Sequence, residues 1–458
     1  MQRITSGNTQ LDAILGGGFP ANSINIVMGE PGSGKTILAE RLVFANAEAD
    51  DRPILYLTTL SEPLEKVVRY LQGFDFYDED RLATGAVVYE SIAEELHAGG
   101  IGALVTKMRT SIKTLSPKVV VIDSFKAIHD ISTSMPEMRR MLYELAGLLT
   151  AYDTTVFLLG EYADGDVAVF PEFAVADGMI QLARKRRGTR DDRFLRVLKL
   201  RGSSYQEGLH AFRITQNGLD VFPRLTSPDV PLEYDPKIDR VTTGVTGLDA
   251  MLGGGLWAGS SVLVAGQTGA GKTTLALQFV LEGLAKGEPA LYVNFQENPT
   301  QLARSITSLG WTMSDAFDRG LHLLYASPVE MQIDSILTEL FATLERGNVK
   351  RVVIDSLGDL VGATEDDTNR IFGYLYALTQ HFAVRRIASV MTLETRQLAE
   401  HALAGQISAL SDAIFTLQVE RTGDRVRRTL QVTKARGTEH DLDVHTLQIT
   451  GKGVSVTE

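Results

Sequence analysis

The chain has 458 residues, of which 44% are hydrophobic and 22% are charged, and its formal net charge is −12. This composition is typical of globular proteins, and the length predicts about two to four domains. The negative charge argues against a general nucleic-acid-binding or acidic-lipid-binding surface, and the absence of cysteine excludes disulfides and thiolate chemistry.

The first residues, Met1 to Thr5, lack the basic and apolar pattern of a signal peptide. No apolar run approaches the roughly 18 to 20 residues that are needed to cross a bilayer. We therefore expect a cytoplasmic protein with no membrane partner.

The N-terminal segment of the chain occurs a second time. ITSGNTQLDAILGGGF, from Ile4, matches VTTGVTGLDAMLGGGL, from Val241. The apolar positions have helical spacing, and the three consecutive glycines predict a turn into the next strand. We interpret the segment as structural, and its repetition predicts two similar domains.

Each copy of this segment leads into a loop that fits the pattern G-x-x-x-x-G-K-[ST]. The loops are GEPGSGKT, Gly29 to Thr36, and GQTGAGKT, Gly266 to Thr273. Each follows an apolar run and precedes a predicted helix, Ile37–Ala47 or Thr274–Leu284, and this order of strand, loop and helix is the context of a phosphate-binding loop. The alternative is a glycine-rich turn with an incidental lysine, and the second copy argues against it.

The glycines allow backbone N–H groups to converge on a polyphosphate. The following helix adds its positive N-terminal end, the lysine adds a charge for the outer phosphates, and the threonine offers a hydroxyl to magnesium. The predicted nucleotide-binding residues are Gly29, Gly32, Ser33, Gly34, Lys35, Thr36, Gly266, Gly269, Ala270, Gly271, Lys272 and Thr273.

Two later apolar runs in each copy predict buried strands. Pro53–Thr59 and Pro289–Phe295 form the first pair, and VVVIDS and RVVIDS form the second, which delivers Asp123 and Asp355. Phosphate-loop enzymes hold the magnesium shell with an aspartate at the end of such a strand. We therefore predict Thr36, Asp123, Thr273 and Asp355 as metal ligands, with an aspartate that caps a turn as the alternative.

The pattern Lys, any residue, Arg, Gly occurs once in each copy, in LKLRG and VTKARG, at the end of a strand-like run. Leu225–Asp239 carries three prolines and predicts a linker between domains 1–224 and 240–458. Alternating strands and helices predict an α/β fold in each domain, a mainly parallel sheet flanked by helices. The basic run Arg184–Arg193 predicts a hairpin tip, which is either a patch for anionic ligands or a solvated turn.

Taken together, the two phosphate loops, the LDxxLGGG segments, the two IDS strands and the two KxRG segments resemble the KaiC family of double-domain RecA-like ATPases. The resemblance covers the chain from Ile4 to about Val454. It implies two tandem RecA-like domains, ATP and Mg²⁺ as cofactors, and a homohexamer of two stacked rings with ATP between neighbouring subunits. It also implies a slow ATPase in the first domain and an autokinase and phosphatase in the second.

The resemblance assigns roles to further residues. It implies that cations from the KxRG segments reach the neighbouring subunit's phosphates; these are Lys199, Arg201, Lys434 and Arg436. A basic pair that is simply solvated is the alternative. The family has two consecutive glutamates after the second strand, whereas this chain has Gln296 and Glu297 in one domain and Leu60 and Ser61 in the other. Glu297 is therefore the candidate water-orienting residue, and Glu62, one residue later than the pattern, is a second candidate that could instead cap a helix.

The family's phosphorylated Ser and Thr pair corresponds here to Ser408 and Ala409. Ser408 is thus the candidate phosphorylation site, expected near the second phosphate loop, or an ordinary cap serine. Ser411 is expected in an exposed loop as a competing acceptor.

Three functions remain open from the sequence. The first is an ATP-hydrolysing hexamer with possible serine autophosphorylation. The second is a hexameric scaffold in which nucleotide joins the subunits and sets a shape that a signalling protein partner binds. The third is a RecA or RadA type DNA-binding ATPase, against which the net charge of −12 and the lack of an aromatic and basic stacking surface argue.

Overall fold

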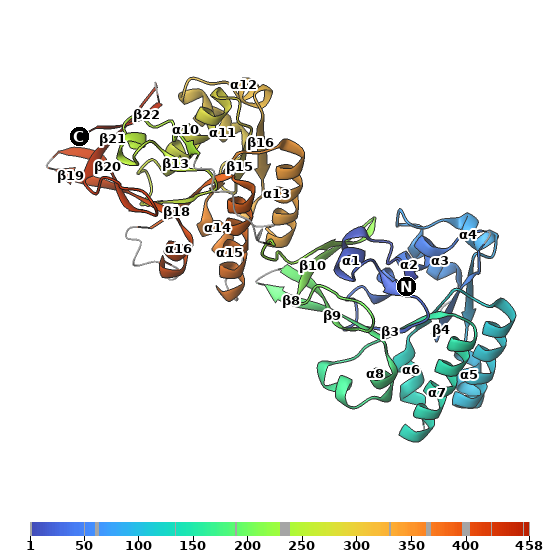
Figure 1. The fold of residues 1–458 in the computed structure, drawn as a ribbon. Coiled ribbons are helices and arrows are strands. Elements are labelled where there is room, and N and C mark those ends of the chain that lie inside the picture. The colour runs from blue at the N-terminus through green and yellow to red at the C-terminus, as the bar shows by residue number, and fades with distance from the viewer. Residues whose placement is uncertain are drawn as a thin grey trace. The chain divides into compact units, whose positions relative to one another are not determined.

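The computed structural model describes residues 2–49, 51–59, 64–132, 134–187, 190–229, 239–328, 331–362, 368–395, 404–422, 424–451 and 453–457. The chain divides into two compact units, Met1–Arg224 and Leu225–Glu458. Each unit is built around one large sheet with helices on both faces (Figure 1).

The strands of the first unit are β1 (Arg3–Ile4), β2 (Phe19–Pro20), β3 (Ile24–Gly29), β4 (Ile54–Thr58), β5 (Val87–Ser91), β6 (Val119–Asp123), β7 (Thr155–Gly160), β8 (Gly178–Arg187), β9 (Arg190–Leu200), β10 (His210–Thr215) and β11 (Gly218–Phe222). Its helices are α1 (Thr9–Ile14), α2 (Lys35–Asn46), α3 (Leu64–Leu71), α4 (Glu79–Ala83), α5 (Ala93–Leu115), α6 (Phe125–Ile131), α7 (Met135–Ala151), the 3₁₀ helix η1 (Asp164–Ala168) and α8 (Pro171–Val175).

The large sheet of the first unit has the order β11-β10-β9-β8-β3-β7-β6-β4-β5. The strands from β8 through β3 to β5 are parallel to one another, whereas β9, β10 and β11 add antiparallel hairpins at one side. The register places Thr58, Asp123 and Leu159 side by side at the carboxyl edge. The ends of three strands therefore meet where the phosphate loop leaves β3.

The central strands are buried on both faces, as their continuous apolar sequences predict. Along β4, Ile54 and Tyr56 belong to one hydrophobic cluster and Leu55 and Leu57 to the other, because successive side chains of a strand point to opposite faces. The first cluster packs under α1 and α2, and the second under α5, α6 and α7 (Figure 1). Helices on both faces thus hold the strand ends that carry the site.

The strands of the second unit are β12 (Arg240–Val241), β13 (Leu256–Trp257), β14 (Ser261–Gly266), β15 (Ala290–Asn294), β16 (Leu321–Tyr325), β17 (Arg351–Asp355), β18 (Ala388–Glu394), β19 (Ala413–Thr422), β20 (Arg425–Ala435), β21 (Val444–Thr450) and β22 (Gly453–Thr457). Its helices are α9 (Leu248–Met251), α10 (Lys272–Ala285), α11 (Pro299–Ser308), α12 (Met313–Asp318), α13 (Ile333–Gly347), α14 (Leu357–Gly362), α15 (Thr368–Arg385) and α16 (Ala404–Leu410).

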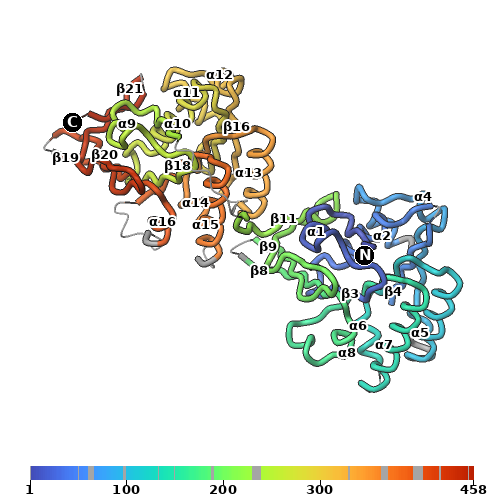
Figure 2. The backbone as a smooth tube through the Cα atoms, in the orientation of Figure 1, coloured from blue at the N-terminus to red at the C-terminus, as the bar shows by residue number. Residues whose placement is uncertain are grey.

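The second sheet repeats the arrangement, in the order β16-β15-β17-β18-β14-β19-β20-β21-β22. The strands from β16 to β19 are parallel and β20 to β22 are antiparallel. Helices α13, α14 and α15 cover one face and pack on a single cluster, and they lie together in the tube view as well (Figure 2). The predicted pair of tandem α/β domains with mainly parallel sheets is confirmed.

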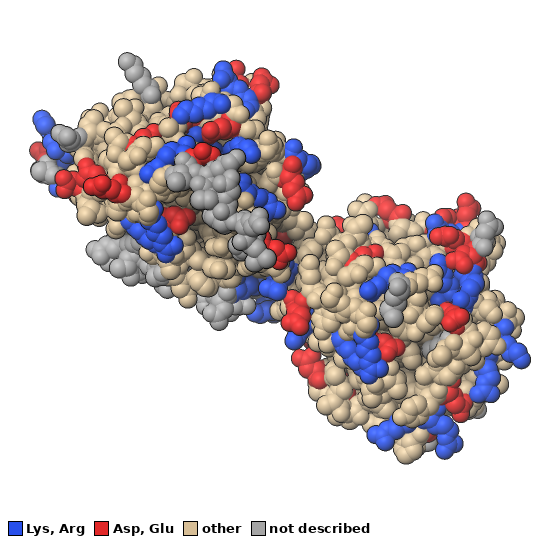
Figure 3. All heavy atoms as spheres, in the orientation of Figure 1, with Lys and Arg blue, Asp and Glu red and all other residues tan. Residues whose placement is uncertain are grey.

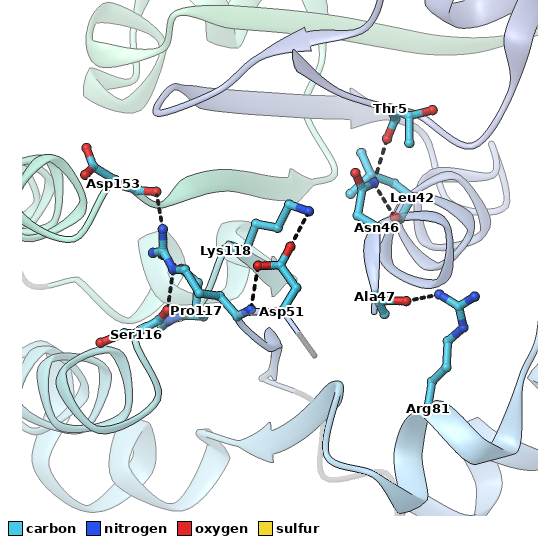
Figure 4. A network of polar contacts seen from close by, with 11 residues as sticks. Thr5, Leu42, Asn46, Ala47, Asp51, Arg81, Ser116, Pro117, Lys118 and Asp153 are labelled. Carbon is cyan, nitrogen blue, oxygen red and sulfur yellow. Dashed lines mark hydrogen bonds and ion pairs between the residues drawn. The ribbon is translucent and has the colours of Figure 1, made fainter. Parts of the chain in front are cut away.

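A network of hydrogen bonds fixes the amino edge of the first sheet, opposite the phosphate loop (Figure 4). The Arg52 guanidinium donates to the carbonyl oxygens of Ser116 and Asp153, at 2.7 and 3.2 Å. Beside it, Lys118 forms an ion pair with Asp51 at 2.7 Å. One side chain before β4 thereby ties together the segments that lead into β6 and β7.

The C-terminal end of α2 is held in the same region (Figure 4). Asn46 donates from Nδ2 to the carbonyl oxygens of Leu42 and Thr5, at 2.7 and 2.8 Å. Arg81 donates to the carbonyl oxygen of Ala47, just after the helix. The helix that follows the phosphate loop is thus anchored at its far end, in part by Thr5 of the repeated N-terminal segment.

The basic run Arg184–Arg193 forms the predicted hairpin, since β8 and β9 pair as far as Arg187 and Arg190. Within this hairpin Arg190 pairs with Asp192 at 3.1 Å and Arg184 with Asp191 at 3.9 Å. On the face drawn in Figure 3, basic and acidic side chains are interspersed in both units. None of the described helices is long and apolar enough to cross a membrane.

Candidate functional site

In both units the phosphate loop joins the end of a central strand to the start of a helix, β3 to α2 and β14 to α10. Gly34 and Gly271 precede the helices with φ angles of 105° and 103°, in the left-handed region that favours glycine. A Cβ atom would also meet the Ile214 side chain at 3.3 Å in the first loop and Ile449 at 2.8 Å in the second. The loops therefore need glycine at this position for both backbone conformation and space.

The helices begin at the loop lysines, slightly earlier than the sequence predicts. Lys35 Nζ donates to the carbonyl oxygens of Gly29 and Glu30, at 2.9 and 3.0 Å, and Lys272 Nζ donates to that of Gln267 at 3.0 Å. Burial lowers the pKa of both lysines, and nearby carboxylates oppose that shift. Each ammonium group is thus held inside the curve of its loop, where a bound polyphosphate would meet it.

The first unit brings Thr36 and Asp123 together. Thr36 Oγ1 donates to Asp123 Oδ2 at 2.8 Å, and the Tyr56 hydroxyl donates to the same oxygen at 2.9 Å. Burial raises the pKa of Tyr56, and the charge of Asp123 raises it further, so that the phenol remains a donor. The aspartate at the end of β6 is therefore fixed against the first turn of α2.

The second unit repeats this arrangement. Thr273 and Tyr292 each donate to Asp355 Oδ2 at 2.8 Å, and Thr392 from β18 donates to the other carboxylate oxygen. Magnesium prefers oxygen ligands and usually takes one or two carboxylates together with water and substrate phosphates. A threonine hydroxyl beside an aspartate, next to a phosphate loop, fits that requirement in both units.

Two acidic residues beside the loops were missed in the sequence, Glu161 and Glu394. Each directly follows or ends an apolar strand, and Glu394 pairs with Gly266, the first residue of the second loop. Their charges act on Lys35 and Lys272, where they oppose the effect of burial on the lysine pKa. The signal was present, because the same pattern of apolar strand and then acid identified Asp123.

Glu297 lies just beyond β15 in a turn organised by Asn294. The Asn294 side chain accepts from the backbone N–H groups of Gln296 and Glu297, both at 3.1 Å, and donates to the Glu297 carbonyl at 2.7 Å. Burial raises the pKa of Glu297, and the charge of Asp355 raises it further, which makes the carboxylate a better proton acceptor. Among the described residues its Oε2 has no hydrogen-bond partner. The other candidate, Glu62, lies outside the described residues.

A buried acid that the sequence did not single out, Glu40, lies on α2 in the first unit. It is 1% exposed, and the Tyr89 hydroxyl donates to its Oε2 at 2.5 Å. Burial raises the pKa of Glu40 to about 8. It lines a cavity of about 610 Å³ that also reaches Lys35, Thr36 and Asp123. The second unit has Leu277 at the matching helix position, so this acid distinguishes the two sites.

This buried acid should make the stability of the first unit depend on pH. The pKa of Glu40 is about 8 in the folded state and about 4.5 in the unfolded chain. The stability that comes from this difference is therefore fully present below pH 4.5 and is lost as the pH rises through about 8. In that window Glu40 should contribute a fall of about 1.4 kcal/mol per pH unit to the free energy of unfolding, and Glu40→Gln should remove that contribution. Both tryptophans, Trp257 and Trp311, lie in the second unit, so amide hydrogen exchange of α2 is the measurement. Exposed Glu48→Gln is the matched control, and an unchanged slope in Glu40→Gln would contradict the assignment.

In the first unit the KxRG segment lies at the edge of the sheet opposite the loop. Lys199 Nζ donates to the Ala176 carbonyl at 2.5 Å, and Arg201 pairs with Asp177 at 3.3 Å. Asp177 in turn accepts from the N–H of Ile24, the first residue of β3. The phosphate loop leaves the other end of the same strand.

The second unit shows the same placement. Lys434 Nζ donates to the carbonyl oxygens of Ser408 and Ser411, at 2.6 and 2.7 Å, and Arg436 donates to that of Ala409 at 2.8 Å. Asp412, which follows Ser411, accepts a hydrogen bond from the backbone N–H of Ser261 at the start of β14. A strand of this length spans about 17 to 20 Å, so these cations do not reach the loop of their own unit.

Two expectations about the serines are wrong. Ser408 does not lie near the second phosphate loop of its own unit, because α16 precedes β19 at the amino edge of the sheet. Ser411 is not in an exposed loop: it is fully buried, and its hydroxyl donates to the Ile407 carbonyl at 2.9 Å. The edge at which each segment lies follows from the order of the strands in the sheet, and that order is not evident from the sequence.

Comparison with known proteins agrees with this architecture. A family model described as ATPase: KaiC matches residues 4–226 and 241–458. The chain is 28% identical to the circadian clock oscillator protein KaiC of Picosynechococcus sp., over all of this chain and 90% of that protein. It is also 28% identical to the circadian clock oscillator protein KaiC 1 of Synechocystis sp., over all of this chain and 89% of that protein. The two family matches span nearly the whole chain and coincide with two sheets that each carry a phosphate loop, so this protein belongs to the KaiC family of ATPases.

Proposed function

We propose that this protein binds Mg-ATP at both phosphate loops and hydrolyses it slowly where neighbouring subunits of a homohexameric ring meet. The observation that carries the proposal is the position of the two KxRG segments, each at the sheet edge opposite the loop of its own unit. A cation there can act on the phosphates at the matching loop only if another copy of the chain brings that loop to it. Contacts between unlike surfaces of identical subunits form a ring when the rotation between neighbours closes, whereas a symmetric dimer needs the same surface on both subunits, which supports a ring here.

The residues of the second unit supply a complete set of roles for hydrolysis. Thr273 and Asp355 would hold a magnesium ion, which would supply positive charge to offset that of the phosphates, and Lys272 would hold the outer phosphates. Glu297 accepts a proton from the attacking water, whose oxygen bonds to the γ-phosphorus as the bond from that phosphorus to the ADP oxygen breaks. ADP leaves with the electron pair of that bond, and Arg436 of the neighbouring copy offsets the charge in the transition state.

The two sites should differ in their share of the chemistry. The second unit has Glu297 beside Asp355, whereas the sequence of the first has Ser61 at the matching position. The first site instead has the buried Glu40 beneath Thr36. We therefore assign most of the turnover to the second site and mainly an assembly role to the first.

Measuring molecular size together with phosphate release tests the proposal. The full-length protein should sediment as a hexamer with ATP and Mg²⁺, and as smaller species without nucleotide, and it should release phosphate slowly. Gln296, in place of an acid, favours a second candidate function, a scaffold in which ATP joins the subunits for a signalling partner. Hexamers without measurable phosphate release would favour the scaffold, and a species that ATP does not change would refute both.

A serine autokinase activity of the second unit has a specific test. Ser408 is half-buried beside Lys434 and Arg436, at the edge where a neighbour's loop would bring ATP. Incubation with Mg-ATP should add one phosphate of about 80 Da to the intact mass, and Ser408→Ala should remove that addition. Ser411→Ala is the matched control and should leave it unchanged, because Ser411 is buried. Phosphate that persists in Ser408→Ala would contradict this site.

A further inference from the structure

Gln296 has a defined partner in the structure, the carboxylate of Asp359. Gln296 Nε2 lies 3.2 and 3.1 Å from the two carboxylate oxygens of Asp359. The hydroxyl of Ser356, which directly follows the proposed metal ligand Asp355, donates to Asp359 Oδ2 at 2.7 Å. A chain of hydrogen bonds thus connects the end of β17 to the residue next to Glu297.

This contact determines whether the NH₂ group or the oxygen of the Gln296 amide faces Asp359. A carboxylate only accepts hydrogen bonds, so only the NH₂ group of Gln296 can face Asp359. The amide oxygen is then directed away from Asp359 and remains an acceptor. The backbone N–H of Gln296 is fixed as well, by Asn294 Oδ1 at 3.1 Å, so the residue is held both at its backbone and at its side-chain amide.

The first unit lacks this pair. Asp359 lies in the first turn of α14, where its N–H donates to the Ser356 carbonyl at 3.3 Å. Ala127 occupies the same turn in the first unit, donating to the Ser124 carbonyl at 3.2 Å, and it has no carboxylate. The acid is therefore particular to the site that has Glu297.

We infer that Asp359 is a positioning residue that orients the amide of Gln296, so that Gln296 Oε1 accepts a hydrogen bond from the attacking water beside Glu297. A glutamine in phosphoryl-transfer sites can orient water without removing its proton, which here passes to Glu297. The inference deepens the proposed function and rests on ATP hydrolysis at the second loop. It assigns a role to Gln296, the amide at the position where the family pattern has a glutamate.

Four variants of the full-length protein test this: Asp359→Asn, Gln296→Glu, the double variant, and Glu345→Gln as a control that removes an exposed carboxylate of α13. Asp359→Asn should lower kcat for ATP roughly 10- to 100-fold, because its amide can face Gln296 with either end and no longer fixes it. KM should stay within about twofold, since the phosphate loop is untouched. The double variant exchanges donor and acceptor and should recover kcat to within about fivefold of the wild type.

The pH dependence separates positioning from a purely structural role. Gln296→Glu alone places two carboxylates together, and protonation of either one restores a donor, so its kcat relative to wild type should rise as pH falls. An unchanged kcat in Asp359→Asn, or a double variant no better than either single one, would overturn the inference. ATP-dependent assembly of each variant shows that it is folded. A wild-type protein that releases no phosphate would instead refute the proposed function itself.

Discussion

Lys272→Ala should lower phosphate release by the full-length protein at least about 100-fold, since it removes a preorganised charge from the transferring phosphate. Lys35→Ala should leave most of the turnover in place and weaken ATP-dependent assembly instead. The two lysines have matching environments, because burial and paired carboxylates act on the pKa of both. The expected difference therefore comes from the residues around them, above all Glu297 beside Asp355.

The alanine variants are compared with substitutions of an exposed lysine. A lysine-to-arginine variant of the loop is not a suitable control, because arginine at that position is not a conservative change. Lys113→Ala on α5 and Lys350→Ala before β17 are the exposed-lysine controls in the first and second units. Phosphate release and sedimentation with ATP give the two readouts. Equal loss of turnover in Lys35→Ala and Lys272→Ala would refute the division of labour between the sites.

Arg436→Ala should lower turnover by roughly 10³-fold or more, the range found for cations that act on a transferring phosphoryl group from a neighbouring subunit. The structure gives Arg436 no access to the loop of its own unit, because it pairs with Asp412, which accepts a hydrogen bond from the first residue of β14, whereas the loop leaves the other end of that strand. Any effect on the second loop must therefore be exerted on another copy. Lys434→Ala should show a smaller loss, since Lys434 also holds the carbonyl oxygens of Ser408 and Ser411.

A mixing experiment distinguishes action between subunits from a structural defect. Lys272→Ala and Arg436→Ala are each expected to be inactive. A ring that contains both variants has an intact site wherever an intact loop faces an intact arginine. At equal amounts, random assembly should restore about a quarter of the wild-type turnover. Phosphate release that stays at the level of the separate variants, although the rings have mixed, would show that Arg436 does not act across the contact. Arg346→Ala on α13 is the control for loss of an exposed arginine.

Several site features were accessible from the sequence because each depends on a few consecutive residues. The phosphate loop requires glycine at Gly34 and Gly271 for its backbone conformation, and the lysine and threonine that follow are fixed by the helix that begins there. Asp123 and Asp355 were found because a buried parallel strand delivers its last side chain to the edge where the loop lies. The same rule applied to β7 and β18 would have found Glu161 and Glu394.

Other features could not be obtained in that way, because they join segments that are distant in the sequence. Glu40 looks like an exposed helix position until β5 brings Tyr89 beside it. Asp359 looks like an ordinary residue of a helical turn until β15 places Gln296 next to it. In both cases the contact depends on which strands are neighbours in the sheet.

By itself the sequence determined two mainly parallel α/β domains, a phosphate loop in each, and an aspartate and a threonine suited to magnesium. Local repetition and short-range backbone chemistry are sufficient for these features. Only the tertiary structure decided that Arg201 and Arg436 lie at the opposite edge from their own loops, and that Ser411 is buried. The reason is that β9 and β20 run antiparallel to the strands that carry the loops, and this direction returns their last residues to the amino edge of the sheet.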